Sequence, residues 1–364
     1  MLLLFAAVIS ITADFEGGSL GRVENVGPHQ YRAHVLGQVD QNGRNRQASW
    51  YYFRVDHAKD RTLTFDMVDL PGEYNYRPNK GAITQDTPPF YSYDQVTWHP
   101  VEDAVFDAAE PKLRFRIASK SDRLWIAHVP PYTNSTFANL VRDVSKSPHV
   151  RRTSVGRSVE GREIPLLTIT DTSYPDDGKK VIWLMFRQHA WEAGSSWTGE
   201  GLIRSVTSGD PLAARIRRET ILKILPLCDP DGVAHGGVRF NRHGYDLNRN
   251  WDLVDPVKMP EIAAERHAIL DWVDAGKRVD FFLTVHNTET NEYLNGPPDV
   301  SGALKPLLDG VFRVWSEGKT FSAAQAPVFA QASTTAGKPG RMNVIQGLYH
   351  DRKLPAFEVE MRIA

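Results

Sequence analysis

The 364-residue sequence contains one cysteine, Cys228, so neither an internal disulfide nor a cysteine-based zinc site can form. A glycine-rich phosphate-binding signature is also absent. The net charge of −1 gives no overall field that would attract nucleic acid or an anionic membrane surface. After the N-terminus no stretch is long and apolar enough to cross a bilayer, so we expect no stable membrane association. Nothing in the sequence indicates an oligomeric state.

The composition is that of a globular protein, with 41% hydrophobic and 24% charged residues, and the length allows two domains. The apolar residues 2–11 resemble part of a secretory signal, and Thr12 and Ala13 could precede a cleavage site. No Lys or Arg comes before them, however, so a first buried strand is the alternative. We expect a secreted or periplasmic protein, with a cytoplasmic one as the alternative.

Two regions of the chain differ in hydrophobic pattern. Residues 14–130 carry short runs of alternating apolar and polar residues between turn signals, which predicts an N-terminal antiparallel β-sandwich domain. Residues 131–364 carry continuous apolar runs between helical patterns, which predicts an α/β domain with a mixed, mostly parallel sheet flanked by helices. The expected strands of this domain cover residues 164–170, 180–187, 220–227, 280–285 and 355–361. The expected helices cover residues 196–207, 211–218, 259–275 and 301–316, after a first helix capped by Asn134 or Ser135.

A His and a carboxylate three residues apart, His189 and Glu192, follow the buried strand expected at residues 180–187. Such a pair can reach one cation, and two imidazoles with one carboxylate leave a fourth zinc position open, as catalytic sites do. The spacing alone recurs by chance, and the ordinary alternative is a surface or capping role. His286 also comes directly after an expected strand. Ligand sites in open α/β sheets lie at the carboxyl edge of the strands, which favours a site at these positions.

A turn-rich loop after the strand expected at residues 220–227 contains Asp229-Pro-Asp-Gly232, Arg239 and Gly244-Tyr-Asp-Leu-Asn-Arg-Asn-Trp251. An arginine guanidinium can grip a carboxylate through two hydrogen bonds and stays charged at any working pH. The alternative is that the loop arginines are solvated or pair with Asp246 and Asp252.

This loop resembles the zinc carboxypeptidase family, and most of all its cytosolic-carboxypeptidase subfamily and the bacterial relatives of that subfamily. Three further segments, Asp14–Gly21, Trp50–Arg54 and Pro131-Tyr132, resemble landmarks of the N-terminal β-sandwich in the same subfamily. The resemblance therefore spans nearly the whole chain. It implies the zinc carboxypeptidase fold for residues 131–364.

Carried onto this sequence, the resemblance implies one zinc ion held by three side chains, those of His189, Glu192 and His286. Arg239 would lie beside the scissile carbonyl group, and Asn248 and Arg249 would hold the terminal carboxylate of the substrate. Glu360 would be the general base that takes a proton from the attacking water. Glu358 competes for that role, since residues two apart on a strand share one face.

The chain departs from the family pattern at three places. Trp191 stands where several digestive relatives have Arg, so contacts with substrate must differ there. The tyrosine that many relatives place near the leaving group cannot be located: residues 329–333 offer Ala330, and Tyr293 and Tyr349 are weak substitutes. The sequence ends four residues after Glu360, where relatives usually continue with a helix, so the catalytic domain is expected to lack its last helix if the chain is a fragment.

The leading hypothesis is a zinc metallocarboxypeptidase that hydrolyses the C-terminal peptide bond of peptides or proteins. Lys338 and Arg341 would favour an acidic terminal residue if they line the pocket, and they are otherwise exposed on a Gly/Pro-rich loop. One alternative is a zinc amidohydrolase that deacylates small N-acyl amino acids. Another is a non-catalytic peptide-binding relative.

Overall fold

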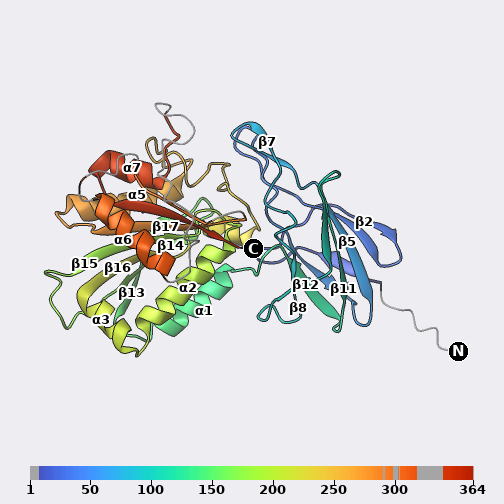
Figure 1. The fold of residues 1–364 in the computed structure, drawn as a ribbon, viewed down its shortest axis with the longest axis horizontal. Coiled ribbons are helices and arrows are strands. Elements are labelled where there is room, and N and C mark those ends of the chain that lie inside the picture. The colour runs from blue at the N-terminus through green and yellow to red at the C-terminus, as the bar shows by residue number, and fades with distance from the viewer. Residues whose placement is uncertain (1–7, 290–291, 298–301, 303, 318–338, 364) are drawn as a thin grey trace. The chain divides into compact units, whose positions relative to one another are not determined.

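The computed structural model describes residues 8–289, 292–297, 302, 304–317 and 339–363. The chain divides into two compact units (Figure 1). One contains the residues up to Thr133 together with Val233–Val238, and the other contains Asn134–Gly232 and Arg239–Ile363. The short segment Val233–Val238 thus groups with residues far before it in the sequence, which the hydrophobic pattern alone does not indicate.

The first unit is a β-sandwich of two five-stranded sheets, with strand orders β1-β4-β12-β8-β9 and β10-β11-β5-β3-β2, plus a β6-β7 hairpin. All pairings are antiparallel except β3 with β5. The strands are β1 (Ser10–Thr12), β2 (Val23–Gly27), β3 (Gln30–His34), β4 (Tyr52–Asp56), β5 (Thr62–Val68), β6 (Gly72–Tyr74), β7 (Arg77–Asn79), β8 (Phe90–Ser92), β9 (His99–Pro100), β10 (Ala104–Asp107), β11 (Lys112–Ala118) and β12 (Arg123–Ala127).

Period-two alternation builds this sandwich, as strand β11 shows. Leu113, Phe115 and Ile117 are buried in the core between the sheets, whereas Arg114 and Arg116 on the opposite face are exposed. The predicted β-sandwich is confirmed. The last two residues of the apolar N-terminal run, with Thr12, form β1 and pair with β4, while residues 1–7 lie outside the described part.

The second unit is built on a seven-stranded mixed sheet with the order β13-β14-β16-β15-β17-β19-β18. Its strands are β13 (Val150–Arg157), β14 (Glu163–Ile169), β15 (Lys180–Phe186), β16 (Thr220–Leu225), β17 (Phe281–Thr288), β18 (Tyr293–Asn295) and β19 (Ala356–Arg362). Its helices are α1 (Asn134–Val144), α2 (Ala193–Thr207), α3 (Pro211–Glu219), α5 (Pro260–Asp274), α6 (Leu304–Glu317) and α7 (Val344–Arg352), and the short helix α4 (Pro230–Ala234) begins in this unit and ends in the first.

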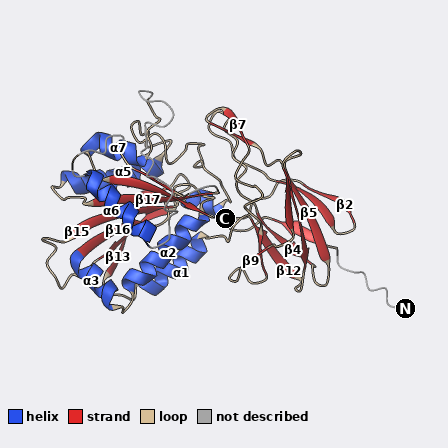
Figure 2. Cartoon of the chain, in the orientation of Figure 1, coloured by secondary structure: helices blue, strands red, loops and turns tan. Residues whose placement is uncertain are grey.

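The centre of this sheet, β16-β15-β17-β19, is parallel, and the three outer pairings are antiparallel. Helices lie on both faces, as the blue ribbons around the red strands show (Figure 2). On one face Trp183 and Met185 of β15 pack in a core with residues of α5 and α7. On the other face α2 approaches Phe186 closely at Gly199, where an added Cβ would lie 3.2 Å from the phenylalanine ring. The predicted α/β class is therefore confirmed.

No helix among the described residues is both long and apolar enough to span a bilayer.

Candidate active site

The central parallel strands bring three distant segments to one edge of the sheet. In β15 and β17, Phe186 lies opposite Val285, and in β17 and β19, His286 lies opposite Glu360. The carboxyl ends of parallel strands meet at the same edge, which is where ligand sites form in such sheets. The loop that begins at Arg187 therefore starts beside His286, and Glu360 stands next to His286 on the neighbouring strand.

A tight turn between β15 and α2 presents the first two candidate ligands. Arg187 adopts a left-handed backbone conformation with φ of 61°, and its guanidinium donates to the Ala190 carbonyl oxygen at 2.9 and 2.6 Å. The turn closes with a hydrogen bond from the Glu192 N–H to the His189 carbonyl oxygen. Glu192 lies directly before α2, and the positive end of a helix dipole stabilises a carboxylate there.

A glycine ties this turn to β17. The Gly194 N–H donates to the Asn287 side-chain oxygen at 3.0 Å. An added Cβ at Gly194 would also lie 3.0 Å from that oxygen, so a larger residue would push the helix start away from the strand. Since Asn287 follows His286, this contact fixes the spacing between the two segments that carry the candidate ligands.

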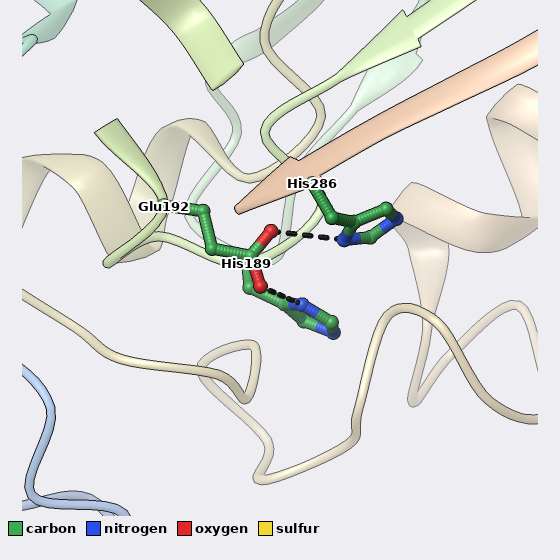
Figure 3. Close-up of side chains that lie close together, drawn as sticks. All are labelled: His189, Glu192 and His286. Carbon is green, nitrogen blue, oxygen red and sulfur yellow. Dashed lines mark hydrogen bonds and ion pairs between the residues drawn. The ribbon is translucent and has the colours of Figure 1, made fainter. Parts of the chain in front are cut away.

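His189, Glu192 and His286 converge on one point (Figure 3). The Nδ1 atoms of the two imidazoles face the Glu192 carboxylate, at 2.7 Å for His189 and 2.9 Å for His286. One ligand atom from each residue lies within 4.8 Å of the other two. All three side chains are buried, so a cation would find little competition from bulk water.

The second nitrogen of each imidazole ring, Nε2, has a hydrogen-bond partner that suits metal binding at Nδ1. The His189 Nε2 lies 3.1 Å from a carboxylate oxygen of Asp246. An ionised carboxylate can only accept a hydrogen bond, so Nε2 is the ring nitrogen that carries a proton towards Asp246. The His286 Nε2 lies 3.1 Å from the Gln188 side-chain oxygen. With a proton on Nε2, each imidazole in its neutral form has its lone pair at Nδ1 beside Glu192, which gives the two-histidine, one-carboxylate set of catalytic zinc sites.

The Glu192 carboxylate and the neighbouring imidazoles shift one another's pKa values. Burial alone would raise the pKa of Glu192, but the neighbouring imidazoles His189 and His286 hold it well below its usual range. Burial would lower the pKa of His286, but Glu192 outweighs burial and raises it to about 9. A cationic imidazole thus balances the carboxylate in the metal-free chain, and a bound metal ion would take over that role.

The structure separates the two candidate bases, although they share a face of β19. Glu358 is buried and accepts hydrogen bonds from the side-chain amides of Asn248 at 2.8 Å and Asn295 at 3.0 Å. Glu360 lies across from His286, and its buried Oε2 has no hydrogen-bond partner among the described residues. Burial, and then the charge of Glu192, raise the pKa of Glu360 well above its ordinary value. A cation at the cluster would favour its ionised form.

Asp246 connects the candidate ligand His189 to Arg239. One oxygen of Asp246 faces His189, and the other accepts from Arg239 Nε at 2.6 Å. This is the pairing with Asp246 that the sequence left open as an alternative for Arg239. Burial would raise the pKa of Asp246, but the Arg239 guanidinium and His189 hold it well below its usual range. The positive charge of Arg239 also acts on Glu360, where it lowers the pKa and so opposes the larger effect of burial.

Asn248 and Arg249 follow Asp246 on the same loop and are buried. The Asn248 side chain donates to Glu358, and its oxygen accepts from the Val344 N–H at 3.0 Å. Arg249 Nη1 donates to the Asn248 carbonyl oxygen at 2.7 Å. The structure therefore brings Asn248 next to the cluster, with its side-chain nitrogen 3.5 Å from His286 Nε2, and Arg249 follows it directly in the chain.

The two candidate tyrosines differ in position. Tyr293 on β18 lies directly opposite Glu360 on β19, and opposite residues of antiparallel strands share one face. Tyr349 lies on α7, where the Lys353 ammonium is 4.6 Å from its ring centroid. Arg341 is half-buried. Lys338 and residues 329–333 lie outside the described part of the chain.

Sequence reasoning missed the groups that orient the candidate ligands. Gln188 precedes the first histidine, Thr284 lies two residues before the second, and Asp246 was noted only as a partner for arginine. The sequence did contain part of the information needed to find these groups. A ligating histidine needs an acceptor for its other ring nitrogen, so polar residues flanking the histidines were candidates.

Two family models match this sequence. Residues 138–303 match the zinc carboxypeptidase family, and residues 11–129 match the cytosolic carboxypeptidase N-terminal domain. The chain therefore contains a zinc carboxypeptidase domain that follows a cytosolic carboxypeptidase N-terminal domain. Zinc is the metal that this family uses, and the His-Glu-His cluster is a set of residues that could hold it.

The chain is 28% identical over 305 residues to cytosolic carboxypeptidase 6 of Mus musculus, which covers 79% of this chain and 55% of the relative. It is 27% identical over 306 residues to an uncharacterized protein of Zymomonas mobilis, with 82% and 74% covered. The chain thus spans little more than half the length of the mouse relative.

Solved structures share the whole fold. A metallo-carboxypeptidase from Burkholderia cenocepacia aligns with a TM-score of 0.82 at 24% identity, covering 98% of this chain and 90% of the other. A metallo-carboxypeptidase from Pseudomonas aeruginosa, in complex with (2-guanidinoethylmercapto)succinic acid, aligns with a TM-score of 0.77 at 24% identity, covering 97% and 90%. These similarities confirm the predicted fold.

Proposed function

We propose that the chain is a zinc-dependent metallocarboxypeptidase that hydrolyses the C-terminal peptide bond of peptides or proteins. The observation that carries the proposal is the convergence of His189, Glu192 and His286 beside Glu360 at one sheet edge. Burial of the three ligands and acceptors for both outer ring nitrogens support a metal role over a surface or capping role.

Bound by these residues, zinc would supply a Lewis acid and lower the pKa of a water molecule towards neutrality. Glu360 is proposed to accept a proton from the attacking water and return it to the leaving amine. Its buried Oε2 suits this role, because it has no protein donor to compete for it among the described residues. Glu358 is less suited, since Asn248 and Asn295 already donate to its oxygens.

Arg239 and Arg249 are proposed to handle the two negative charges of the reaction. Arg239 would stabilise the oxyanion that develops at the scissile carbonyl, with Asp246 fixing its guanidinium. Arg249, with Asn248, would bind the terminal carboxylate of the substrate. A clamp of this kind would restrict cleavage to chain ends, because an internal peptide bond offers no carboxylate.

The proposed preference for a terminal Glu or Asp rests on two basic residues of one segment, Lys338 and Arg341. Arg341 is half-buried and follows Gly340, whose N–H donates to Asp252 at 2.8 Å in the same unit. The preceding Lys338 adds to the positive charge of this segment in the sequence. We therefore propose acidic C-terminal residues as the preferred substrates.

A panel of matched peptides tests this proposal. Zinc-loaded protein should release a C-terminal Glu faster than Lys or Phe, and a chelator should abolish release, with recovery on adding zinc. Blocking the terminal carboxylate as an amide should lower cleavage by ~10²-fold or more, since a charged hydrogen-bonded pair is lost. Equal cleavage of the amide would contradict the clamp and favour a different amidohydrolase. Preference for Phe would remove the acidic specificity, and no hydrolysis of any peptide would remove the function.

A further inference from the structure

A buried amide side chain, that of Gln188, joins a candidate metal ligand to the loop that precedes the proposed carboxylate clamp. Gln188 lies directly before His189 and is fully buried. Its side-chain nitrogen donates to the Leu247 carbonyl oxygen at 2.9 Å. Its side-chain oxygen lies 3.1 Å from His286 Nε2 and accepts from the Thr284 hydroxyl at 3.1 Å. One side chain therefore contacts both segments at once.

The orientation of the Gln188 amide follows from its partners. A backbone carbonyl oxygen can only accept, so the Leu247 oxygen requires the NH₂ group of Gln188 to face it. The carbonyl oxygen of the amide must then face His286 and Thr284. The Thr284 hydroxyl fits this arrangement, because it donates its proton to the Gln188 oxygen while its own oxygen, 3.1 Å from His286 Nε2, accepts from the N–H of that ring. The amide cannot flip without placing two acceptors against each other at Leu247.

This orientation has a consequence for His286. An acceptor opposite Nε2 requires that Nε2 carry a proton, so the lone pair of a neutral imidazole is at Nδ1. Nδ1 is the atom that faces Glu192 at 2.9 Å, at the point where the three candidate ligands converge. The other histidine is oriented by a different group, the Asp246 carboxylate. A neutral amide at His286 adds no further negative charge beside Glu358, whose Oε2 is 3.9 Å from Nε2.

We infer that Gln188 is a positioning residue that fixes the tautomer and ring orientation of His286 for metal binding and ties that ligand to the Leu247 loop. The inference rests on the proposed function, because it assumes that His286 binds zinc through Nδ1. Gln188 does not contact zinc or substrate in this account. It acts through His286 on metal affinity, and through Leu247 on the neighbouring residues Asn248 and Arg249.

Three variants of Gln188 test this role through the affinity of the metal-free protein for Zn²⁺, measured by competition with a chelating dye. Gln188→Met and Gln188→Leu keep a similar volume but remove the acceptor, and should weaken zinc binding by ~10–100-fold, the usual cost of losing such a partner. Gln188→Glu, when protonated, can donate to Leu247 and still accept from His286. It should bind zinc within about threefold of the wild type.

The relative zinc affinities of the three variants distinguish a positioning role of Gln188 from a packing role. If Gln188 only filled space, the apolar variants would bind zinc normally and Gln188→Glu would be the damaging change. A visible absorption spectrum of the Co²⁺-loaded protein should change in Gln188→Met and remain as in the wild type in Gln188→Glu. Gln346→Met is a matched control, because Gln346 is a buried amide of α7 that caps its own helix through Asn343. Its zinc affinity should not change.

Normal zinc affinity in a folded Gln188→Met or Gln188→Leu protein would overturn the inference, and so would equal losses in all three variants. Two apolar variants are included so that the misfolding of one leaves the test intact. Zinc binding is measured without peptide, so the proposed function is judged separately. Wild-type protein that binds zinc but cleaves no peptide would contradict the function alone, whereas Gln188→Met protein with normal affinity and activity would contradict only this inference.

Discussion

Glu360→Gln is expected to lower kcat for peptide hydrolysis by at least ~10²–10⁴-fold, the usual contribution of a general base. The glutamine keeps the shape of the side chain but cannot take a proton from water at neutral pH. Zinc content should remain that of the wild type, because Glu360 is not among the three converging ligands. KM should change little, since Glu360 lies on β19 whereas the proposed substrate clamp lies on the loop that contains Asn248 and Arg249. Steady-state kinetics on zinc-loaded protein, with elemental analysis, measures both.

The matched control is Glu358→Gln, two residues away on the same face of β19. Glu358 binds Asn248 and Asn295, so its loss should lower the thermal unfolding midpoint and raise KM through Asn248. Its kcat should fall far less than that of Glu360→Gln. A larger kcat loss in Glu358→Gln would show that the roles of the two carboxylates are the reverse of those proposed.

Arg249→Met is expected to reduce kcat/KM for a peptide with a free C-terminus by ~10²–10³-fold, mainly by raising KM. The reason is that a buried charged partner of the substrate carboxylate is lost, which costs about 3–4 kcal/mol. Cleavage of the same peptide as its C-terminal amide should change little, because that substrate never uses the clamp. Comparing both peptides with both proteins gives the coupling between Arg249 and the carboxylate directly.

Arg242→Met controls for loss of a positive charge on the same loop. Arg242 is exposed and pairs with Glu160 at 2.8 Å. Its kinetics should match those of the wild type on both peptides. An Arg249 variant that lost activity equally on free and amidated peptides would contradict the clamp, since such a loss would reflect general damage to the site.

The main elements of the fold could be predicted because their signals are local. Strand β15 is a continuous apolar run, and β11 alternates strictly, so burial alone determines both. Strand β13 was missed because it is a polar strand at the edge of the sheet. Helix α7 was also missed, although Asn343 and Gln346 form a capping box at its start that the sequence displays.

The convergence of His189, Glu192 and His286 could be predicted because strand ends can be recognised in the sequence and parallel strands bring their ends together. His189 and Glu192 follow β15, as expected, and lie in the turn before α2. The choice between Glu358 and Glu360 could not be made from sequence. The choice depends on which carboxylate accepts hydrogen bonds from the side-chain amides of Asn248 and Asn295. Those contacts join residues that are far apart in the chain.

Counting bound metal tests the central claim most directly. Wild-type protein, dialysed after exposure to Zn²⁺, should retain about one zinc ion per chain by elemental analysis, and His286→Ala protein that is still folded should retain essentially none. A wild-type chain that binds no zinc, or a folded His286→Ala chain that keeps a full equivalent, would contradict the assignment of these side chains to one metal ion.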